Sequence, residues 1–172
     1  FINDHCIVRA PPGYYLEGVP GTNETYTWQF YLRVAIFEQN CLFEIVKWLY
    51  ENHDPQFQYA AMETAGPPML SALKLFGVNQ RVQIDGFAIR KDQKKYGLRN
   101  WFEGLIHSSK PVIILDDMAN SKTTITRAAS ICEEHGIPVA GAKTIVNKKD
   151  EDNVEGIPVK SMFTIDDFDL QW

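Results

Sequence analysis

The sequence predicts an α/β protein with a single domain, in which a mostly parallel sheet is flanked by helices. Apolar segments of strand length alternate with amphipathic segments of helix length along most of the chain. Residues 111–115 (PVIIL) form the continuous apolar run that is typical of a strand buried on both faces. A chain of 172 residues with 45% hydrophobic and 23% charged residues is long enough for one core and has an ordinary globular composition.

The first 33 residues fit this alternation least well. Pro11-Pro12-Gly13 and Pro20-Gly21 break them into short pieces that are rich in aromatic residues. We expect residues 1–33 to form a small N-terminal hood or flap over the ligand crevice. Ordinary packing at the edge of the sheet is the alternative.

Three segments are predicted to be helices. Residues 37–50 place apolar side chains near a helical period, and Asp54-Pro55 ends this helix. Residues 67–76 carry proline in the first turn, with Gly77 as the expected stop. A third helix over 123–134 is closed by His135-Gly136.

The strands are predicted between these helices and after them, at 57–62, 81–89, 111–115, 137–146 and 157–162, with a last helical turn at 165–168. Right-handed crossovers would then bring the carboxyl ends of the parallel strands to one edge of the sheet. Ligands of such sheets bind at that edge. The functional residues are therefore expected just after Met62, Ile89, Leu115 and Val146.

Composition excludes several classes. The net charge of −5 argues against a general nucleic-acid partner, and the chain has no run of about 18 apolar residues for a membrane span. Cys6, Cys41 and Cys132 are odd in number and far apart, so neither disulfides nor a zinc site is expected. A cytoplasmic location is expected as well. Since the chain starts with Phe1 and not Met, a preceding leader stays open.

The strongest local motif is residues 111–124 (PVIILDDMANSKTT). Asp116 and Asp117 end a buried strand, and a loop of short polar side chains leads into a helix N-terminus, where backbone N–H groups favour an anion. The two carboxylates suit vicinal sugar hydroxyls or, through water, Mg²⁺. The motif favours a ribose 5-phosphate site, with a plain turn and a helix cap as the alternative. A nucleotide-binding P-loop is excluded because 115–120 contains no glycine.

A basic segment occupies residues 90–99, where five basic residues stand against one acidic residue in an otherwise acidic chain. Such a concentration favours an anionic ligand, although a charge run is often only a solvated surface. The basic residues are Arg90, Lys91, Lys94, Lys95 and Arg99.

Residues 113–124 resemble the ribose-phosphate-binding signature of the type I phosphoribosyltransferases. Further segments are similar, in the right order, to the orotate phosphoribosyltransferase branch of that family; these are residues 30–33, 62–68, 87–104 and 156–168. The resemblance covers roughly residues 28–170 and implies the fold of that family. It also implies a Mg²⁺-dependent pentosyltransferase of nucleotide biosynthesis, in the pyrimidine branch. Such an enzyme transfers the ribose 5-phosphate of phosphoribosyl pyrophosphate (PRPP) to an orotate-like nucleobase and releases pyrophosphate.

The resemblance also assigns roles to residues. It implies that Lys94, Asp116 and Asp117 are catalytic, and that residues 90–104 form a mobile loop that reaches the neighbouring subunit of a homodimer. Mg²⁺ would be held through PRPP and water near the two aspartates and not by direct protein ligands. The implied base-binding residues are Phe30, Tyr31 and Lys148, and the implied PRPP-binding residues are Glu63, Thr64, Ala65, Gly66, Arg90, Lys91, Asn120, Ser121, Lys122, Thr123 and Thr124.

Three positions depart from the family pattern. Lys122 stands where the phosphate loop carries glycine, Ala65 where many pyrophosphate loops carry lysine, and Tyr96 where the mobile loop carries histidine. These departures keep a second hypothesis open, namely a regulatory module that binds PRPP or a nucleotide without turnover. A third hypothesis is an interaction domain that binds no PRPP.

Overall fold

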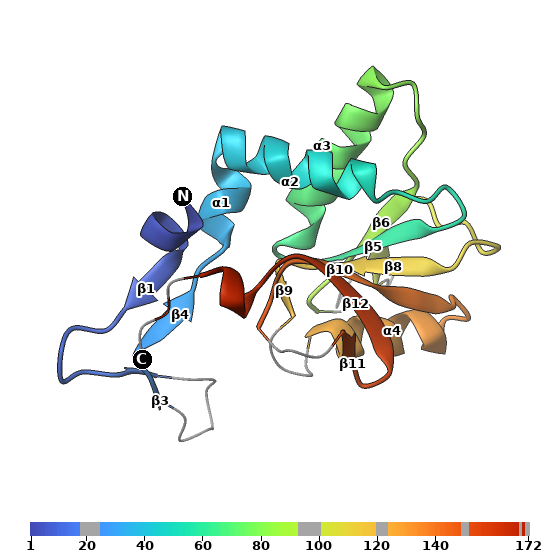
Figure 1. The fold of residues 1–172 in the computed structure, drawn as a ribbon. Coiled ribbons are helices and arrows are strands. Elements are labelled where there is room, and N and C mark those ends of the chain that lie inside the picture. The colour runs from blue at the N-terminus through green and yellow to red at the C-terminus, as the bar shows by residue number, and fades with distance from the viewer. Residues whose placement is uncertain (18–24, 93–100, 120–123, 149–151, 169, 171–172) are drawn as a thin grey trace.

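The centre of the computed structural model is one sheet of eight strands (Figure 1). The structure describes residues 1–17, 25–92, 101–119, 124–148, 152–168 and 170. Five neighbouring strands of the sheet run parallel, and short antiparallel strands extend both edges. The parallel strands are β5 (Gln58–Met62), β6 (Gly86–Ile89), β8 (Val112–Leu115), β10 (Val139–Asn147) and β12 (Ile157–Thr164), the edge strands are β7 (Phe102–Glu103) and β11 (Asn153–Val154), and β9 (Met118–Ala119) pairs with β10.

The order of the parallel strands fixes where a ligand can bind. Across the sheet they lie in the order β6-β5-β8-β10-β12. The chain therefore starts the parallel part at β5, adds β6 on one side and places the later parallel strands β8, β10 and β12 on the other. The direction of winding therefore reverses between β5 and β8. In sheets of this kind the crevice lies outside the carboxyl ends of the strands at this reversal. Residues after Met62 and Leu115 meet there, as the sequence predicts.

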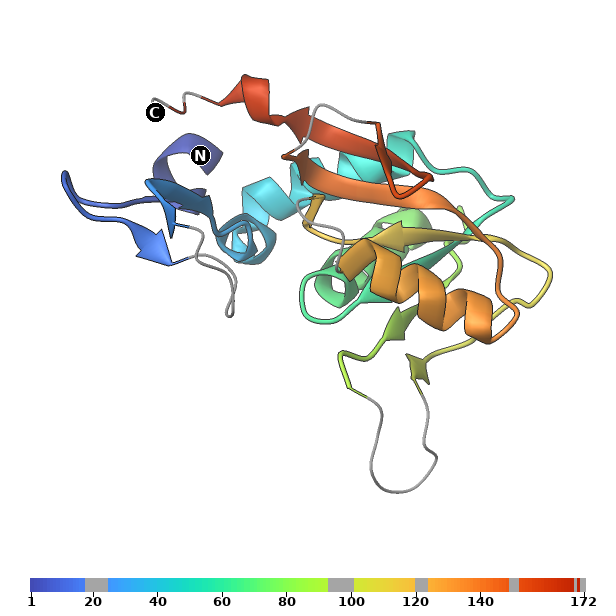
Figure 2. The same ribbon diagram turned by 90° about the horizontal axis from the view of Figure 1, so that it is seen from below.

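Helices cover both faces of the sheet. Helices α2 (Gln39–Glu51) and α3 (Gly66–Asn79) lie on one face, and α4 (Thr124–Glu134) lies on the other (Figures 1 and 2). Two apolar clusters follow from this arrangement, one under α2 and α3 and one under α4. Fully buried Leu49 and Leu73 belong to the first, and Phe87 and Ile125 to the second. The central strands β5 and β8 are thus covered on both faces, which explains their continuous apolar sequences.

The predicted strand over 81–89 is wrong in its first half. Only Gly86–Ile89 is a strand, because Arg81 has a left-handed φ of 59° and the N–H of Val82 donates to the carbonyl of Gly77 at 2.8 Å. Gly77 does not stop its helix either, since α3 continues to Asn79. A Cβ at Gly77 would lie 2.7 Å from both the Val82 carbonyl and the Ile84 side chain, so this glycine permits close packing.

The N-terminal part lies beside the helix α1 (Arg33–Phe37), away from the centre of the sheet (Figure 1). It packs against the 3-10 turn η2 (Ile165–Asp167), where the rings of Phe30 and Phe168 are 5.1 Å apart. Its elements are the short helix η1 (Ile2–Cys6) and the strands β1 (Ile7–Arg9), β2 (Leu16–Glu17), β3 (Thr25–Tyr26) and β4 (Trp28–Phe30), which pair antiparallel as β1-β4 and β2-β3. Whether it acts as a hood stays a prediction.

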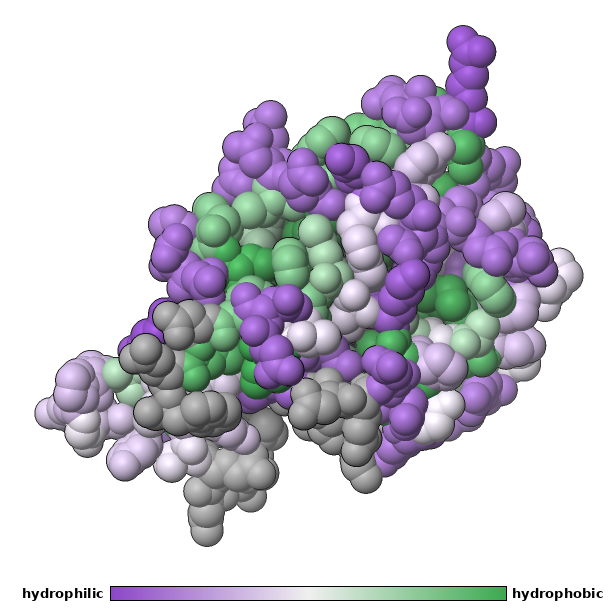
Figure 3. All heavy atoms as spheres, in the orientation of Figure 1, coloured by the Kyte–Doolittle hydropathy of each residue, from purple (hydrophilic) through white to green (hydrophobic). Residues whose placement is uncertain are grey.

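An apolar groove of about 710 Å³ lies between α2 and α3. Exposed Phe43 and Leu75 flank it, and Figure 3 shows apolar residues that interrupt the polar surface over α1 and α2. None of the described helices has both the length and the hydrophobicity that crossing a bilayer requires.

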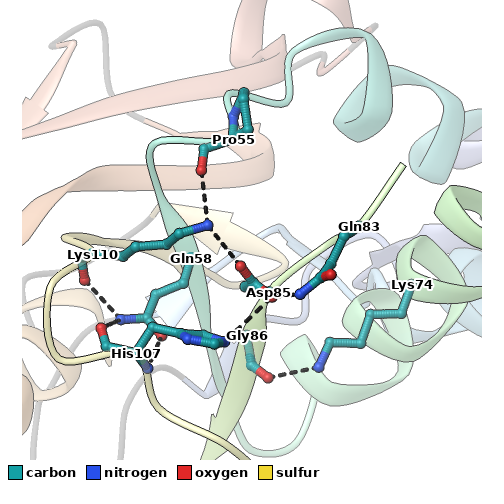
Figure 4. A network of polar contacts seen from close by, with 8 residues as sticks. All are labelled: Pro55, Gln58, Lys74, Gln83, Asp85, Gly86, His107 and Lys110. Carbon is teal, nitrogen blue, oxygen red and sulfur yellow. Dashed lines mark hydrogen bonds and ion pairs between the residues drawn. The ribbon is translucent and has the colours of Figure 1, made fainter. Parts of the chain in front are cut away.

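A polar cluster fastens the amino ends of the strands, opposite the ligand edge (Figure 4). Fully buried Gln58 donates to the carbonyls of His107 and Lys110, both at 2.7 Å, and accepts from the N–H of His107 at 3.0 Å. Asp85 pairs with the Lys110 ammonium at 2.7 Å and with the His107 ring at 3.4 Å. The cluster therefore ties the segment before β8 to β5 and β6.

Replacing Asp85 with Asn is expected to lower the free energy of unfolding by about 1–2 kcal/mol at pH 7, because Lys110 loses its charged partner. The hydrogen bond from Lys110 is the main reason why the pKa of Asp85 is lowered. The ionised carboxylate therefore stabilises the fold above the ordinary aspartate pKa, and this contribution is lost as the pH falls through the lowered folded-state value. Urea titrations from pH 3 to pH 7 should show the two proteins converge in acid, and exposed Asp4→Asn is the control. A constant difference across this range would contradict the assignment.

Candidate active site

A cavity of about 380 Å³ opens at the carboxyl ends of β5 and β8. It lies at the reversal of the strand order, and its walls come from the segments that follow β5, β6 and β8 and from the starts of α1 and α4. The lining residues are Arg33, Met62, Glu63, Thr64, Ala65, Lys91, Asp116, Asp117, Met118, Thr124 and Arg127.

The acidic pair lies at the end of β8. Asp116 is 6% exposed, and its Oδ1 accepts a hydrogen bond from the N–H of Asp117 at 3.0 Å. Burial, and then the negative charge of Asp117, raise the pKa of Asp116. Burial also raises the pKa of Asp117, against the lowering effects of its contact with Asp116 and of the positive charge of Arg33. Such a pair is costly to ionise fully, so a ligand that brings hydroxyl donors or a cation is favoured there.

The loop between β5 and α3 forms another wall. The N–H of Glu63 donates to the carbonyl of Ile89 at 2.9 Å, and the Glu63 carboxylate accepts from the N–H of Lys91 at 3.0 Å. The Glu63–Thr64 peptide bond is cis. Gly66 starts α3 in tight contact, since a Cβ there would be 2.5 Å from the carbonyl oxygen of Leu115. This glycine lets the helix begin directly against the ends of β5 and β8.

Arg90 and Lys91, the two predicted PRPP-binding residues of the basic segment that the structure describes, have different surroundings. Lys91 lines the cavity. Arg90 is not among the lining residues, and its guanidinium instead forms an ion pair with Glu103 at 2.6 Å. The predicted catalytic Lys94 lies outside the described residues, as does Tyr96.

The start of α4 contributes Thr124, which lines the cavity. The residues before it that were predicted to bind the 5′-phosphate, Asn120, Ser121, Lys122 and Thr123, lie outside the described residues. The described structure therefore places the start of α4 beside the acidic pair, as the motif indicates.

The predicted base-binding residues do not line this cavity. The Phe30 ring packs on Phe168, and Tyr31 is exposed with the Arg33 guanidinium 5.4 Å from its ring. The Lys148 ammonium lies 4.6 Å from the ring of Tyr26 and 4.8 Å from that of Trp28. These contacts connect the end of β10 with the N-terminal part.

Four lining residues were not predicted as site residues: Arg33, Met62, Met118 and Arg127. Arg127 had a usable signal, because it follows Thr124 by three residues and side chains with this spacing share a helix face. Arg33 lies inside the segment 30–33 that carried the resemblance, without a role assigned to it. Met62 and Met118 likewise lie inside the segments 62–68 and 113–124 that carried the resemblance, without a role assigned to them.

A metal would need ligands from a bound molecule. Among the residues that the structure describes, no group of three or more His, Cys, Asp or Glu side chains could hold a metal ion. Two adjacent carboxylates still fit Mg²⁺, which usually keeps several waters and binds through one or two carboxylates together with phosphate oxygens.

The strand reversal, with the carboxylate pair and the start of α4 beside it, defines an α/β protein whose main cavity lies at the carboxyl ends of the parallel strands. Orotate phosphoribosyltransferase from Mycobacterium tuberculosis has the same fold. Its structure with Fe(III) dicitrate superposes with a TM-score of 0.72, covering 96% of this chain and 93% of that one at 18% identity. Its structure in complex with PRPP gives a TM-score of 0.64 at 19% identity, covering 80% and 81%. The chain therefore has the phosphoribosyltransferase fold.

Sequence comparison finds several proteins that are similar to part of this chain. Orotate phosphoribosyltransferase from Aquifex aeolicus is 28% identical over 102 residues, which cover 57% of this chain and 56% of that enzyme. The transcriptional regulator GfcR from Methanosphaera stadtmanae is 35% identical over 57 residues, 33% of this chain and 29% of that protein. The chain spans about half the length of the curated relatives it matches. No family model matches it. The predicted resemblance to the orotate phosphoribosyltransferases is confirmed.

Proposed function

We propose that this protein is a Mg²⁺-dependent phosphoribosyltransferase that transfers the ribose 5-phosphate of PRPP to an orotate-like nucleobase and releases pyrophosphate. The observation that supports this most is the meeting of three segments in one cavity: the acidic pair after β8, the loop after β5 and the start of α4. The names of the similar proteins support the same reaction.

The proposed role of each residue follows from the chemistry of the cavity wall to which it belongs. Asp116 and Asp117 accept hydrogen bonds from the ribose hydroxyls, because carboxylates are acceptors only. Thr124 and the residues before it bind the 5′-phosphate at the start of α4. Residues 63–66 approach the pyrophosphate with their backbone, and Lys91 adds positive charge at that wall.

Mg²⁺ would be held by oxygens of PRPP and by water near Asp116 and Asp117, and would neutralise charge on the pyrophosphate. The protein groups then fix the sugar while the base attacks. Phe30, Tyr31 and Lys148 are proposed to contact the base. A homodimer in the cytoplasm is part of the proposal, and the apolar groove between α2 and α3 offers a surface for a second copy; sedimentation equilibrium tests the dimer.

A second candidate function is a regulatory module that binds PRPP without turnover. Two observations favour it: Ala65 is buried and brings no charge to the cavity, and one similar protein is named a transcriptional regulator. In that case the cavity would bind PRPP with similar contacts but would lack part of the positive charge that stabilises the leaving group.

The deciding experiment measures PRPP-dependent release of pyrophosphate with Mg²⁺ across orotate, uracil, the common purines and nicotinate. A calorimetric titration with PRPP alone is run on the same sample. Multiple turnovers with one base support the enzyme and identify its acceptor. PRPP binding without turnover supports the regulatory module, and absence of both contradicts the proposed function.

Replacing Lys94 with Ala is expected to lower kcat by about 10²-fold, because a cation near the leaving pyrophosphate acts on charge that develops only in the transition state. The dissociation constant for PRPP should change by less than about threefold. Steady-state kinetics and calorimetry measure the two effects, and exposed Lys47→Ala on α2 is the charge-matched control. A collapse of PRPP affinity at unchanged kcat would make Lys94 a binding residue only.

A further inference from the structure

Arg127 contacts the residues at both ends of the stretch 92–100. It lies in the first turn of α4, where its Nη2 donates to the carbonyl of Lys91 at 2.6 Å. Its guanidinium also lies 5.9 Å from the centre of the Trp101 ring. Lys91 and Trp101 flank residues 92–100, so one side chain joins both ends of this segment to the helix that starts at the proposed phosphate site.

The two ends are also joined to each other and to the β5 loop. The N–H of Arg90 donates to the carbonyl of Trp101 at 2.8 Å, and the Arg90 guanidinium pairs with Glu103. The Glu63 carboxylate accepts from the N–H of Lys91 at 3.0 Å. The backbone of Lys91 is therefore held from two sides, by Glu63 through its N–H and by Arg127 through its carbonyl.

The chemistry of arginine suits these two contacts. A planar guanidinium donates in its plane while an aromatic ring contacts its face, whereas a lysine ammonium is a compact point charge on a flexible stem. Arg127 also lines the cavity together with Lys91, although it is exposed. Its contacts are thus made at the wall of the site and not at a remote surface.

We infer that Arg127 is a positioning residue, which fastens Lys91 and Trp101, at the two ends of the stretch 92–100, to α4 and thereby sets the place of Lys91 at the cavity. The fastening itself does not depend on the proposed function. Its effect on catalysis rests on the proposed function, because there Lys91 contributes to the binding of pyrophosphate.

Limited proteolysis with trypsin tests the fastening without any assay of activity. The sequence places five trypsin sites in residues 90–99, after Arg90, Lys91, Lys94, Lys95 and Arg99. Arg127→Gln should speed cleavage in this segment about tenfold, since an exposed charged hydrogen bond and a cation–π contact are both lost. Arg127→Lys should be intermediate, and exposed Arg81→Gln should match the original protein. Thermal unfolding should stay within about 2 °C in all three variants. Equal cleavage rates in Arg127→Gln and the original protein would overturn the inference.

Kinetics then test the catalytic consequence. Arg127→Gln should raise KM for PRPP by about tenfold and lower kcat less, with partial rescue in Arg127→Lys, because the loss falls on the position of a pyrophosphate contact. Faster cleavage with unchanged KM and kcat would overturn the positioning role while the fastening stands. Faster cleavage in a protein that transfers ribose phosphate to no base would contradict the proposed function and leave the fastening intact.

Discussion

Replacing Asp116 and Asp117 together with Asn is expected to weaken PRPP binding and to lower kcat/KM by about 10²–10⁴-fold. Each hydrogen bond to a charged group contributes about 1.5–3 kcal/mol, and two carboxylates are removed from the ribose. Asn keeps the size of the side chain, and its Oδ1 still accepts from the N–H of residue 117. The expected loss is therefore one of ligand contacts and not of folding. Calorimetry with PRPP and steady-state kinetics measure it.

The same double variant is expected to be more stable than the original protein at neutral pH, by about 1–3 kcal/mol. The folded-state pKa values of Asp116 and Asp117 are raised, so the folded protein binds protons more tightly than the unfolded chain. Stability is therefore lost as the pH rises above the ordinary aspartate pKa, and the loss is complete above the raised values. Asn removes this cost, and below about pH 4 the two proteins should converge. Reduced PRPP affinity together with reduced stability would indicate a disrupted site; exposed Asp166→Asn is the control.

The position of this site follows from the pattern of the sequence. A buried parallel strand shows itself as an apolar run, and the residue after the run must lie at the ligand edge. This rule alone predicts that Asp116 lies at the ligand edge, and Asp116 lines the cavity. The loop after Met62 follows from the same rule. At the ends of these two strands, the apolar pattern of the sequence and the order of the strands lead to the same prediction.

The contacts that were not predicted depend on residues far apart in the chain. The ion pair of Arg90 with Glu103 links the end of β6 to β7. The rings of Tyr26 and Trp28 beside Lys148 depend on how the N-terminal part packs. Composition and periodicity describe neighbours along the chain, and such pairings arise only when the sheet has formed.

Replacing Gly66 with Ala is expected to cost about 2–4 kcal/mol of unfolding free energy and to lower kcat/KM by about 10²-fold. The added Cβ would lie 2.5 Å from the carbonyl oxygen of Leu115 and 2.9 Å from backbone atoms of Ala61, and backbone cannot move aside as a side chain can. Ala61 lies in β5 and Leu115 in β8, and these two strands end next to Glu63 and Asp116. The displacement that relieves the clash therefore also moves two walls of the cavity apart.

The variant Gly77→Ala separates the effect of Gly66→Ala on stability from its effect on kcat/KM. Gly77 lies in the same helix α3, at its other end, and a Cβ there also meets atoms at 2.7 Å. It is expected to lower the free energy of unfolding, measured by urea titration, while kcat/KM of the folded protein stays within about threefold of the original. Because both glycines are packed tightly, a general loosening of α3 would reduce activity in both variants. Activity lost only in Gly66→Ala would show that the separation of the strand ends β5 and β8 sets the geometry of the site, and equal losses would contradict this.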